Sequence, residues 1–270
     1  MGSRLPDIEV KDISIASSIL DHWQKLFQST STDDEPFQHF YCENIWPDDV
    51  FDKLLKFMPP QELYRPLNIN QWVNADGVST RDKCYFSEML DEMEPEAAEF
   101  WKQIVIVISS RKLKNLIFRK FARDVALRLG TDTDNVEGTN PRVAIGLTRD
   151  FEDYVLKPHT DGFPRIVTAQ FYMPVDESQR DLGTTIYAQN GILQRLQKGR
   201  FTSVKRMPFL PNSGYAFAVN NHPDRKSYHG RELISKGSGE RNSILVSWNS
   251  EERVKDPKLG GPEWQLNDLL

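Results

Sequence analysis

The sequence predicts an α+β fold, mainly β, in which a helical first half buttresses a β-rich second half. Apolar residues recur at helical spacing in several segments before Gly130, and short strand-like runs separated by Gly, Pro, Asn and Asp take over from Arg142. The chain has no internal repeat and no low-complexity stretch. Many short strands after a helical half favour a double-stranded β-helix, a jelly-roll architecture.

The first half contains four segments with helical features. One covers residues 13–27, and Pro47 and Pro95 each stand where a first helical residue belongs. The fourth, residues 113–129, has a regular apolar face and stops at Gly130. The opposite face of this segment, within residues 111–123, is basic, and we expect it to be a solvated surface rather than a site for an anionic partner.

Seven strands are expected in the second half, at residues 142–148, 165–174, 183–188, 201–207, 214–219, 227–234 and 241–249. We therefore expect one domain that consists of a helical support region (1–140) and a double-stranded β-helix core (141–250), followed by a C-terminal tail (251–270).

Composition narrows the class of protein. A chain of 270 residues with 39% apolar content can bury one substantial core. A net charge of −5 argues against nucleic acid as a general partner. Two cysteines, Cys42 and Cys84, do not make a disulfide framework and fit a reducing compartment. The apolar run 104–108 is too short to span a bilayer, and the first residues lack a signal pattern, so we expect a cytoplasmic protein with no membrane partner.

Three residues of the second half have the chemistry of a metal site. His159 and Asp161 are two residues apart, so in an extended chain their side chains share one face. For a third ligand the candidates are His229, at the start of an extended run before Gly230, and His222, which lies in a loop. We prefer His229 and interpret His222 as a loop or lid residue. Two imidazoles and one carboxylate with open positions are typical of non-haem Fe(II) oxygenases.

Arg241 and Ser243 stand at the start of the last apolar run and share one face of the expected strand. A guanidinium that faces a core is costly unless it meets an anion, and its planar fork suits a carboxylate. That carboxylate could belong to a bound ligand or to an internal acid, and we prefer the ligand.

These residues resemble the motif of the Fe(II)/2-oxoglutarate-dependent dioxygenases, in which His-x-Asp is followed by a distant His and then by an Arg or Lys. The strand-like run 166–174 and the turns at 182–183 and 211–214 are similar to the framework of that family. The resemblance covers residues 142–250 and is best with the prolyl-4-hydroxylase-like and small-molecule hydroxylase branches. The prolyl-hydroxylase branch usually has Lys where Arg241 stands, which weakens assignment to that branch.

The resemblance implies a cupin-like jelly-roll core, with Fe(II) bound by His159, Asp161 and His229 and with 2-oxoglutarate and O₂ as co-substrates. Arg241 and Ser243 would hold the far carboxylate of 2-oxoglutarate. The resemblance also implies that Gln170 or Tyr172 hydrogen-bonds 2-oxoglutarate. The sequence does not decide which of these two side chains faces inward. Succinate and CO₂ would be released as a substrate carbon is oxidised.

The expected reaction is hydroxylation of an aliphatic carbon of a small molecule, such as an amino acid or a natural-product intermediate. A carboxylate at Asp161 makes hydroxylation the default, while desaturation, ring closure and epimerisation remain open. One alternative is a peptidyl or protein hydroxylase of the same family. Another is a non-catalytic, cupin-like metal-binding module, which would have no need for a carboxylate clamp at Arg241 and Ser243. The sequence leaves the substrate and the oligomeric state open.

Overall fold

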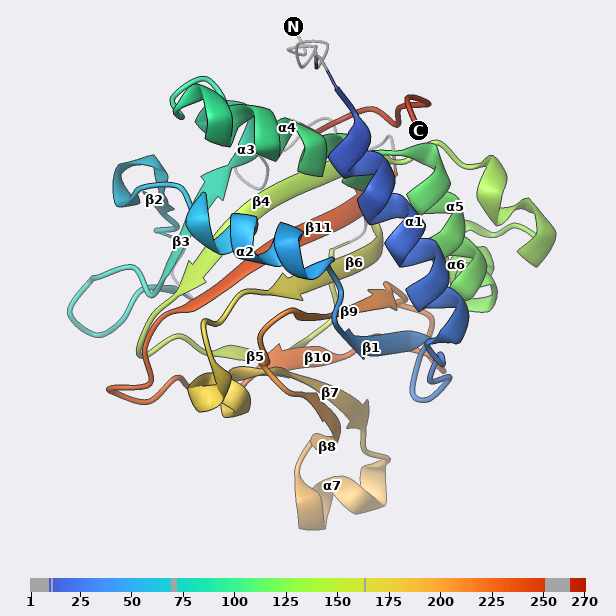
Figure 1. The fold of residues 1–270 in the computed structure, drawn as a ribbon. Coiled ribbons are helices and arrows are strands. Elements are labelled where there is room, and N and C mark those ends of the chain that lie inside the picture. Colours follow the sequence, from blue (N-terminus) through green and yellow to red (C-terminus); the bar gives the residue numbers. More distant parts are fainter. Residues whose placement is uncertain (1–9, 11, 69–71, 163, 251–262) are drawn as a thin grey trace, which may run out of the picture.

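Two antiparallel sheets form the centre of the molecule (Figure 1). The computed structural model describes residues 10, 12–68, 72–162, 164–250 and 263–270. The large sheet has the strand order β1-β9-β6-β11-β4-β3-β2, and the small sheet has the order β5-β10-β7-β8. The strands are β1 (His39–Glu43), β2 (Arg65–Pro66), β3 (Arg81–Tyr85), β4 (Arg142–Asp150), β5 (Leu156–His159), β6 (Arg165–Tyr172), β7 (Thr184–Gln189), β8 (Phe201–Met207), β9 (Ser213–Ala218), β10 (His229–Arg231) and β11 (Arg241–Asn249).

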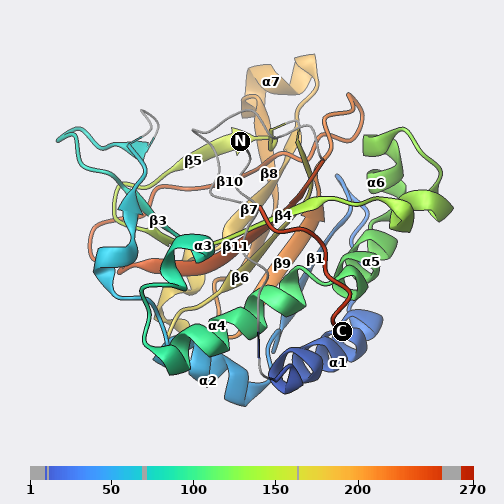
Figure 2. The same ribbon diagram turned by 90° about the horizontal axis from the view of Figure 1, so that it is seen from above.

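Helices cover one face of the large sheet, and the small sheet lies on its other face (Figure 2). The helices are α1 (Ser14–Ser29), α2 (Asp48–Lys56), α3 (Phe86–Met89), α4 (Pro95–Ile108), α5 (Arg111–Lys120), α6 (Ala122–Leu129) and α7 (Ile192–Lys198), with 3₁₀ turns at Gln61–Leu63, Thr133–Gly138 and Glu177–Leu182. Helices α1, α2 and α4 lie under the sheet, whereas α7 projects from the far end of the small sheet.

Alternation along β6 shows why the layers are arranged in this way. The ring of Phe171 points to the helices, 5.7 Å from the ring of Trp23 and 5.1 Å from that of Trp46. The ring of Tyr172 points between the sheets, 4.6 Å from the ring of Phe209. Burial of one such side chain is worth roughly 1.5–3 kcal/mol. A slip of one residue would exchange the two faces, so each core fixes the register of the strand.

The last strand lies in the middle of the large sheet. β11 pairs with β4 on one side and with β6 on the other. The register places Arg241 opposite Asp150 and Ser243 opposite Tyr172. Residues that are far apart in the sequence are thereby held at neighbouring positions, because side chains opposite each other in an antiparallel pair have Cβ atoms about 5 Å apart.

The strands expected after residue 141 are all present, although β10 is shorter than the expected run 227–234. Two features were not expected. β5 contains Pro158, which lowers strand propensity, and it is held as a strand by pairing with β10. The first half is also not only helical, because β1 pairs with β9 and β3 pairs with β4, which extends the large sheet at both sides.

The single helix expected over residues 113–129 is two helices, α5 and α6, that meet at Phe121. This break places the buried ring of Phe121 on that of Phe40, with 5.4 Å between centroids. The basic face is not simply solvated, which corrects the expectation from the sequence. Lys114 is buried and donates to the carbonyl of Glu137, and Lys120 donates to the carbonyls of residues 27 and 30.

The expected tail is also only partly a tail. Residues 251–262 lie outside the described residues, whereas Trp264 is buried and exchanges backbone hydrogen bonds with Val143. Cys42 and Cys84 are both free and buried. None of the helices in the described part of the chain is long and apolar enough to cross a membrane.

Candidate metal centre

His159, Asp161 and His229 converge on one point. One potential ligand atom from each lies within 4.8 Å of the other two. The Nε2 atoms of His159 and His229 are 3.7 and 3.8 Å from Oδ1 of Asp161, and the two imidazole centroids are 4.4 Å apart. Ligands about 2.0–2.2 Å from one divalent ion are separated by distances of this order. The three side chains therefore fit a single metal ion.

Strand pairing brings the two histidines together. His229 of β10 is the register partner of His159 of β5. This close approach depends on Gly230, because a Cβ at that position would lie 2.5 Å from the carbonyl oxygen of Leu156. Asp161 lies two residues beyond the end of β5. The His-Gly pair in the sequence thus has a steric origin in the small sheet.

Both imidazoles are oriented for coordination through Nε2. Nδ1 of His159 is 3.0 Å from the carbonyl oxygen of Lys157, and Nδ1 of His229 is 3.0 Å from that of Ser227. A carbonyl only accepts hydrogen bonds, so Nδ1 carries the proton and the lone pair of Nε2 points to the centre. Hydrogen bonds of this kind fix the tautomer and the ring plane of metal-binding histidines.

The carboxylate of Asp161 is held from two sides. Arg165 donates from Nη1 to Oδ1 and Thr168 donates from Oγ1 to Oδ2, each at 2.6 Å. Burial raises the pKa of Asp161, but Arg165 and the two imidazoles outweigh it and bring this pKa well below its usual range. Burial, opposed by the charge of Asp161, lowers the pKa of His229 to about 4. At neutral pH the centre therefore offers one carboxylate and a neutral His229, as a divalent cation requires.

Arg241 is the buried first residue of β11, and its guanidinium donates hydrogen bonds to groups of the protein itself. Its Nη1 donates to Oδ2 of Asp150 and its Nε donates to the carbonyl of Leu182, both at 2.7 Å. Its Nη2 lies 3.2 Å from Oε1 of Gln170 and from Oγ1 of Thr184. Burial opposes the charge of Arg241, but Asp150 outweighs it and raises the pKa of the guanidinium. The internal acid that the sequence left open as an alternative is therefore present.

Gln170 and Tyr172 both face this region, because residues two apart on a strand share a face. Gln170 donates from Nε2 to Oγ of Ser243 at 2.7 Å and accepts from the hydroxyl of Tyr215 at 2.9 Å. The hydroxyl of Tyr172 accepts from the backbone N–H of Thr184 at 3.0 Å, and its ring lies 5.2 Å from the guanidinium carbon of Arg241. Both side chains, and not only one of them, therefore point toward Arg241 and Ser243.

Several contributors were missed by the sequence reasoning, namely Asp150, Arg165, Thr168, Thr184 and Arg231. Asp150 and Thr184 reach the site through strand register, for which a single sequence carries no signal. Arg165 and Thr168 follow Asp161 by four and seven residues, so a search for polar side chains near the metal pair would have found them.

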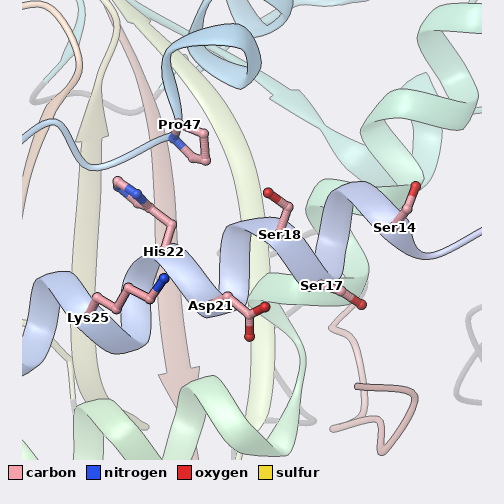
Figure 3. Close-up of a pocket in the computed structure, with 7 residues that line it drawn as sticks. All are labelled: Ser14, Ser17, Ser18, Asp21, His22, Lys25 and Pro47. Atoms are coloured by element: carbon pink, nitrogen blue, oxygen red, sulfur yellow. The ribbon is translucent and has the colours of Figure 1, made fainter.

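Two other features lie apart from the centre. His222 is 45% exposed and lies 3.8 Å from a carboxylate oxygen of Asp224, in the loop between β9 and β10, as expected for a loop residue. A shallow hollow lies on the helical layer (Figure 3). It is lined by six residues of α1 and by Pro47, on the side of the large sheet opposite the small sheet, and is no part of the metal centre.

No model of a known protein family and no curated protein matches this sequence. Solved structures do match the fold. The epimerase SnoN, solved with Fe³⁺, α-ketoglutarate and a nogalamycin compound, is 10% identical with a TM-score of 0.49, over 93% of this chain and 96% of that chain. The Arabidopsis thaliana dioxygenase for auxin oxidation, in complex with 2-oxoglutarate, is 13% identical with a TM-score of 0.48, over 90% of each chain.

A Pseudomonas putida prolyl-4-hydroxylase is 14% identical, with a TM-score of 0.47, over 87% of this chain and 98% of that chain.

Proposed function

We propose that this protein is an Fe(II)- and 2-oxoglutarate-dependent oxygenase. The observation that carries the proposal is the convergence of His159, Asp161 and His229, with both Nε2 lone pairs and one carboxylate oxygen aimed at one point. Two imidazoles and one carboxylate on one face leave coordination positions open for 2-oxoglutarate and O₂. Bound Fe(II) would couple decarboxylation of 2-oxoglutarate, with release of succinate and CO₂, to oxidation of a substrate carbon.

The two sheets support a double-stranded β-helix as the framework of this function. The eight strands β4–β11 contribute four strands to each of two facing sheets, and consecutive strands pass between the sheets except at the β7–β8 hairpin. We propose that the metal ligands lie at one end of this framework, where β5 and β10 pair.

The network around Arg241 supports a site for the far carboxylate of 2-oxoglutarate. Ser243 holds a hydroxyl between Gln170 and Thr148, 2.7 Å from Nε2 of Gln170 and 2.9 Å from Oγ1 of Thr148. Arg241 keeps one N–H of Nη1 beyond the hydrogen bonds given above. We propose that Arg241 and Ser243 donate to that carboxylate, and that Gln170 and Tyr172 orient them.

We propose a small molecule, such as an amino acid or a natural-product intermediate, as the substrate. The support is the loop between β9 and β10, which contacts the backbone of Asp161. Arg225 fixes this loop by donating from Nε to Oδ1 of Asp124 and from Nη2 to the carbonyl of Asp34, both at 2.6 Å. Asn221 of the same loop lies 3.4 Å from the carbonyl of Asp161. A loop held in this way favours an enclosed ligand over an extended peptide.

The test is anaerobic and spectroscopic. Fe(II) followed by 2-oxoglutarate is added to metal-free protein, and the expected result is the weak visible charge-transfer band of the chelate. His229→Ala is expected to abolish the band, and Arg241→Ala to weaken it. A wild-type protein that binds Fe(II) without a band would contradict the proposal and favour a metal-binding module. With the band established, succinate formation stimulated by small molecules or by peptides separates the two substrate classes.

A further inference from the structure

Arg231 is a buried cation that makes few hydrogen bonds within the described part of the chain. It lies two residues after His229, beyond a β-bulge in the pairing of β10 with β5. Its side chain is 4% exposed, and its Nε is buried without a hydrogen-bond partner in the described part of the chain. The hydrogen bond that it does make there is a long one, from Nη1 to Oε2 of Glu232 at 3.3 Å. A buried guanidinium donor without a partner is costly, so this position calls for an acceptor.

Charge in the same region is out of balance. Besides burial, the pKa of the Tyr154 hydroxyl is affected by three buried guanidiniums, which belong to Arg81, Arg231 and Arg241. One buried carboxylate, that of Asp150, acts on it in the opposite direction. Glu232 is half-buried and is shared with Arg206, which lies 3.2 Å from its Oε1. Burial and the charge of Arg241 lower the pKa of Arg231 to about 10, which still leaves it charged at neutral pH. The buried groups around Tyr154 thus carry more positive than negative charge, which favours binding of an additional anion.

Arg231 and Arg241 differ in the number of hydrogen bonds that their guanidiniums donate. Arg241 donates to four acceptors, one of them the carboxylate of Asp150. Among the described residues Arg231 donates to one acceptor, Glu232, and the charge of Arg241 contributes to the lowered pKa of Arg231. Of the two guanidiniums, that of Arg231 therefore has more N–H donors free for an added carboxylate, whereas Asp150 holds that of Arg241 in place.

We propose that Arg231 donates to the far carboxylate of 2-oxoglutarate and is the main determinant of the preference for this co-substrate, an inference that rests on the function proposed above. The sequence motif assigns this carboxylate to Arg241 and Ser243. On this proposal, Arg241 and Ser243 donate to the carboxylate from β11, and Arg231 donates to it from β10.

The test compares two 2-oxo acids on the anaerobic Fe(II) protein. 2-Oxoglutarate and 2-oxobutyrate chelate metal through the same group, but 2-oxobutyrate has no far carboxylate. Each is titrated by its visible charge-transfer band, and the ratio of the two dissociation constants is the readout. For Arg231→Met we expect this ratio to fall by about 10-fold or more, as for loss of a charge-assisted hydrogen bond, with the 2-oxobutyrate band unchanged. The unchanged band also shows that the variant is folded with an intact metal centre.

Arg206→Met is the matched control, because it removes the other arginine that pairs with Glu232, and it is expected to keep the wild-type ratio. Arg231→Lys keeps the charge and is expected to recover part of the preference. A wild-type ratio in Arg231→Met would overturn the assignment of Arg231 and leave the oxygenase proposal standing. Absence of a band with either acid in the wild-type protein would instead overturn the proposed function, and the assignment with it.

Discussion

Arg241 and Asp150 form an ion pair in the interior of the molecule, with 2.7 Å between Nη1 and Oδ2 and with side chains 2% and 0% exposed. The other oxygen of Asp150 lies 2.7 Å from Nε of Arg81, in an orientation that makes no hydrogen bond. The pair is set by register, because Asp150 is the partner of Arg241 on β4 and also the partner of Arg81 on β3. One carboxylate thus fixes two guanidiniums that a strand separates.

Replacement of this carboxylate is expected to be costly. Asp150→Asn leaves two buried guanidiniums without compensation, and loss of one partner of a buried pair destabilises by about 3–5 kcal/mol. Urea denaturation followed by tryptophan fluorescence measures the change. Asp268→Asn, in the exposed pair with Arg111, is the control and is expected to have no measurable effect. Equal stability of Asp150→Asn and wild type would show that the ion pair is not needed for the fold.

The metal centre predicts a contrast between two histidines. His229→Ala removes a buried ligand and is expected to abolish binding of Co(II), a spectroscopic substitute for Fe(II) in sites of this kind. His222→Ala removes an exposed imidazole in the preceding loop and is expected to bind Co(II) as the wild type does. The visible absorption of the bound ion reports both. Loss of binding in His222→Ala alone would mean that the third ligand is misassigned.

The hydrogen bond from Thr168 to Asp161 predicts an effect on metal affinity without loss of a ligand. Thr168→Val keeps the shape of the side chain and removes the hydroxyl that holds Oδ2 at 2.6 Å. Loss of such a partner reduces metal affinity by about 10- to 100-fold. Competition with a chelator of known affinity measures the change, and an unaltered affinity would show that Arg165 alone suffices to orient the carboxylate.

Gly230 predicts a steric effect on the same centre. In Gly230→Ala a methyl group would lie 2.5 Å from the carbonyl oxygen of Leu156, so β5 and β10 must separate and move His159 away from His229. Weaker metal binding and a lower melting temperature are expected. Gly138→Ala is the control, since nothing lies within 4 Å of a Cβ at that position. Similar behaviour of the two variants would contradict the steric argument.

The stability of the metal-free protein is expected to fall as the pH is lowered from about 6.5 to 4. The pKa of His229 is lowered in the fold to about 4 from the ordinary value of 6.5. Above 6.5 both states carry a neutral imidazole, and below 6.5 the unfolded chain binds a proton that the folded chain does not. Stability therefore rises with pH across this window, by up to about 3 kcal/mol for this one group.

Burial also lowers the pKa of His39, which adds to the effect in the same direction. The depressed pKa of Asp161 acts below its ordinary value of 3.8 and does not enter this window. Denaturant titrations at several pH values measure the slope, which is expected to be smaller in His229→Asn than in His222→Asn. Equal slopes would show that His229 is not buried as a neutral group.

The sequence was most informative where chemistry and spacing are local. His159 and Asp161 were identified from their separation of two residues, and their convergence follows from an extended backbone. His229 was chosen over His222 because it starts an extended run and precedes a glycine, and the structure gives that glycine a steric reason. All of the strands after residue 141 except β5 were found from alternation and turn residues, which depend on neighbours in the chain.

The residues that were missed depend on distant pairing. Asp150 is the last residue of β4 and lies two residues beyond the end of the expected strand 142–148; its role comes from being the register partner of Arg241. β3 carries Arg81, Asp82 and Lys83 in succession, a composition that does not indicate a strand, and it is one because β4 offers an edge. Arg231 attracted no attention in the sequence because a lone arginine has no pattern. Only its burial without a partner makes it a candidate.

The central position of β11 has a consequence for how the chain folds. β4 and β6 do not pair with each other, and each finds its inner neighbour in a strand made from residues 241–249. β1 likewise has no strand to pair with until β9 has been synthesised. On the ribosome, the two halves of the large sheet, β2-β3-β4 and β1-β9-β6, therefore cannot be joined until nearly all of the described chain has been synthesised, and the inner edges of β4 and β6 stay open meanwhile. Contacts of such long sequence separation predict slow folding and a need for protection by chaperones during synthesis.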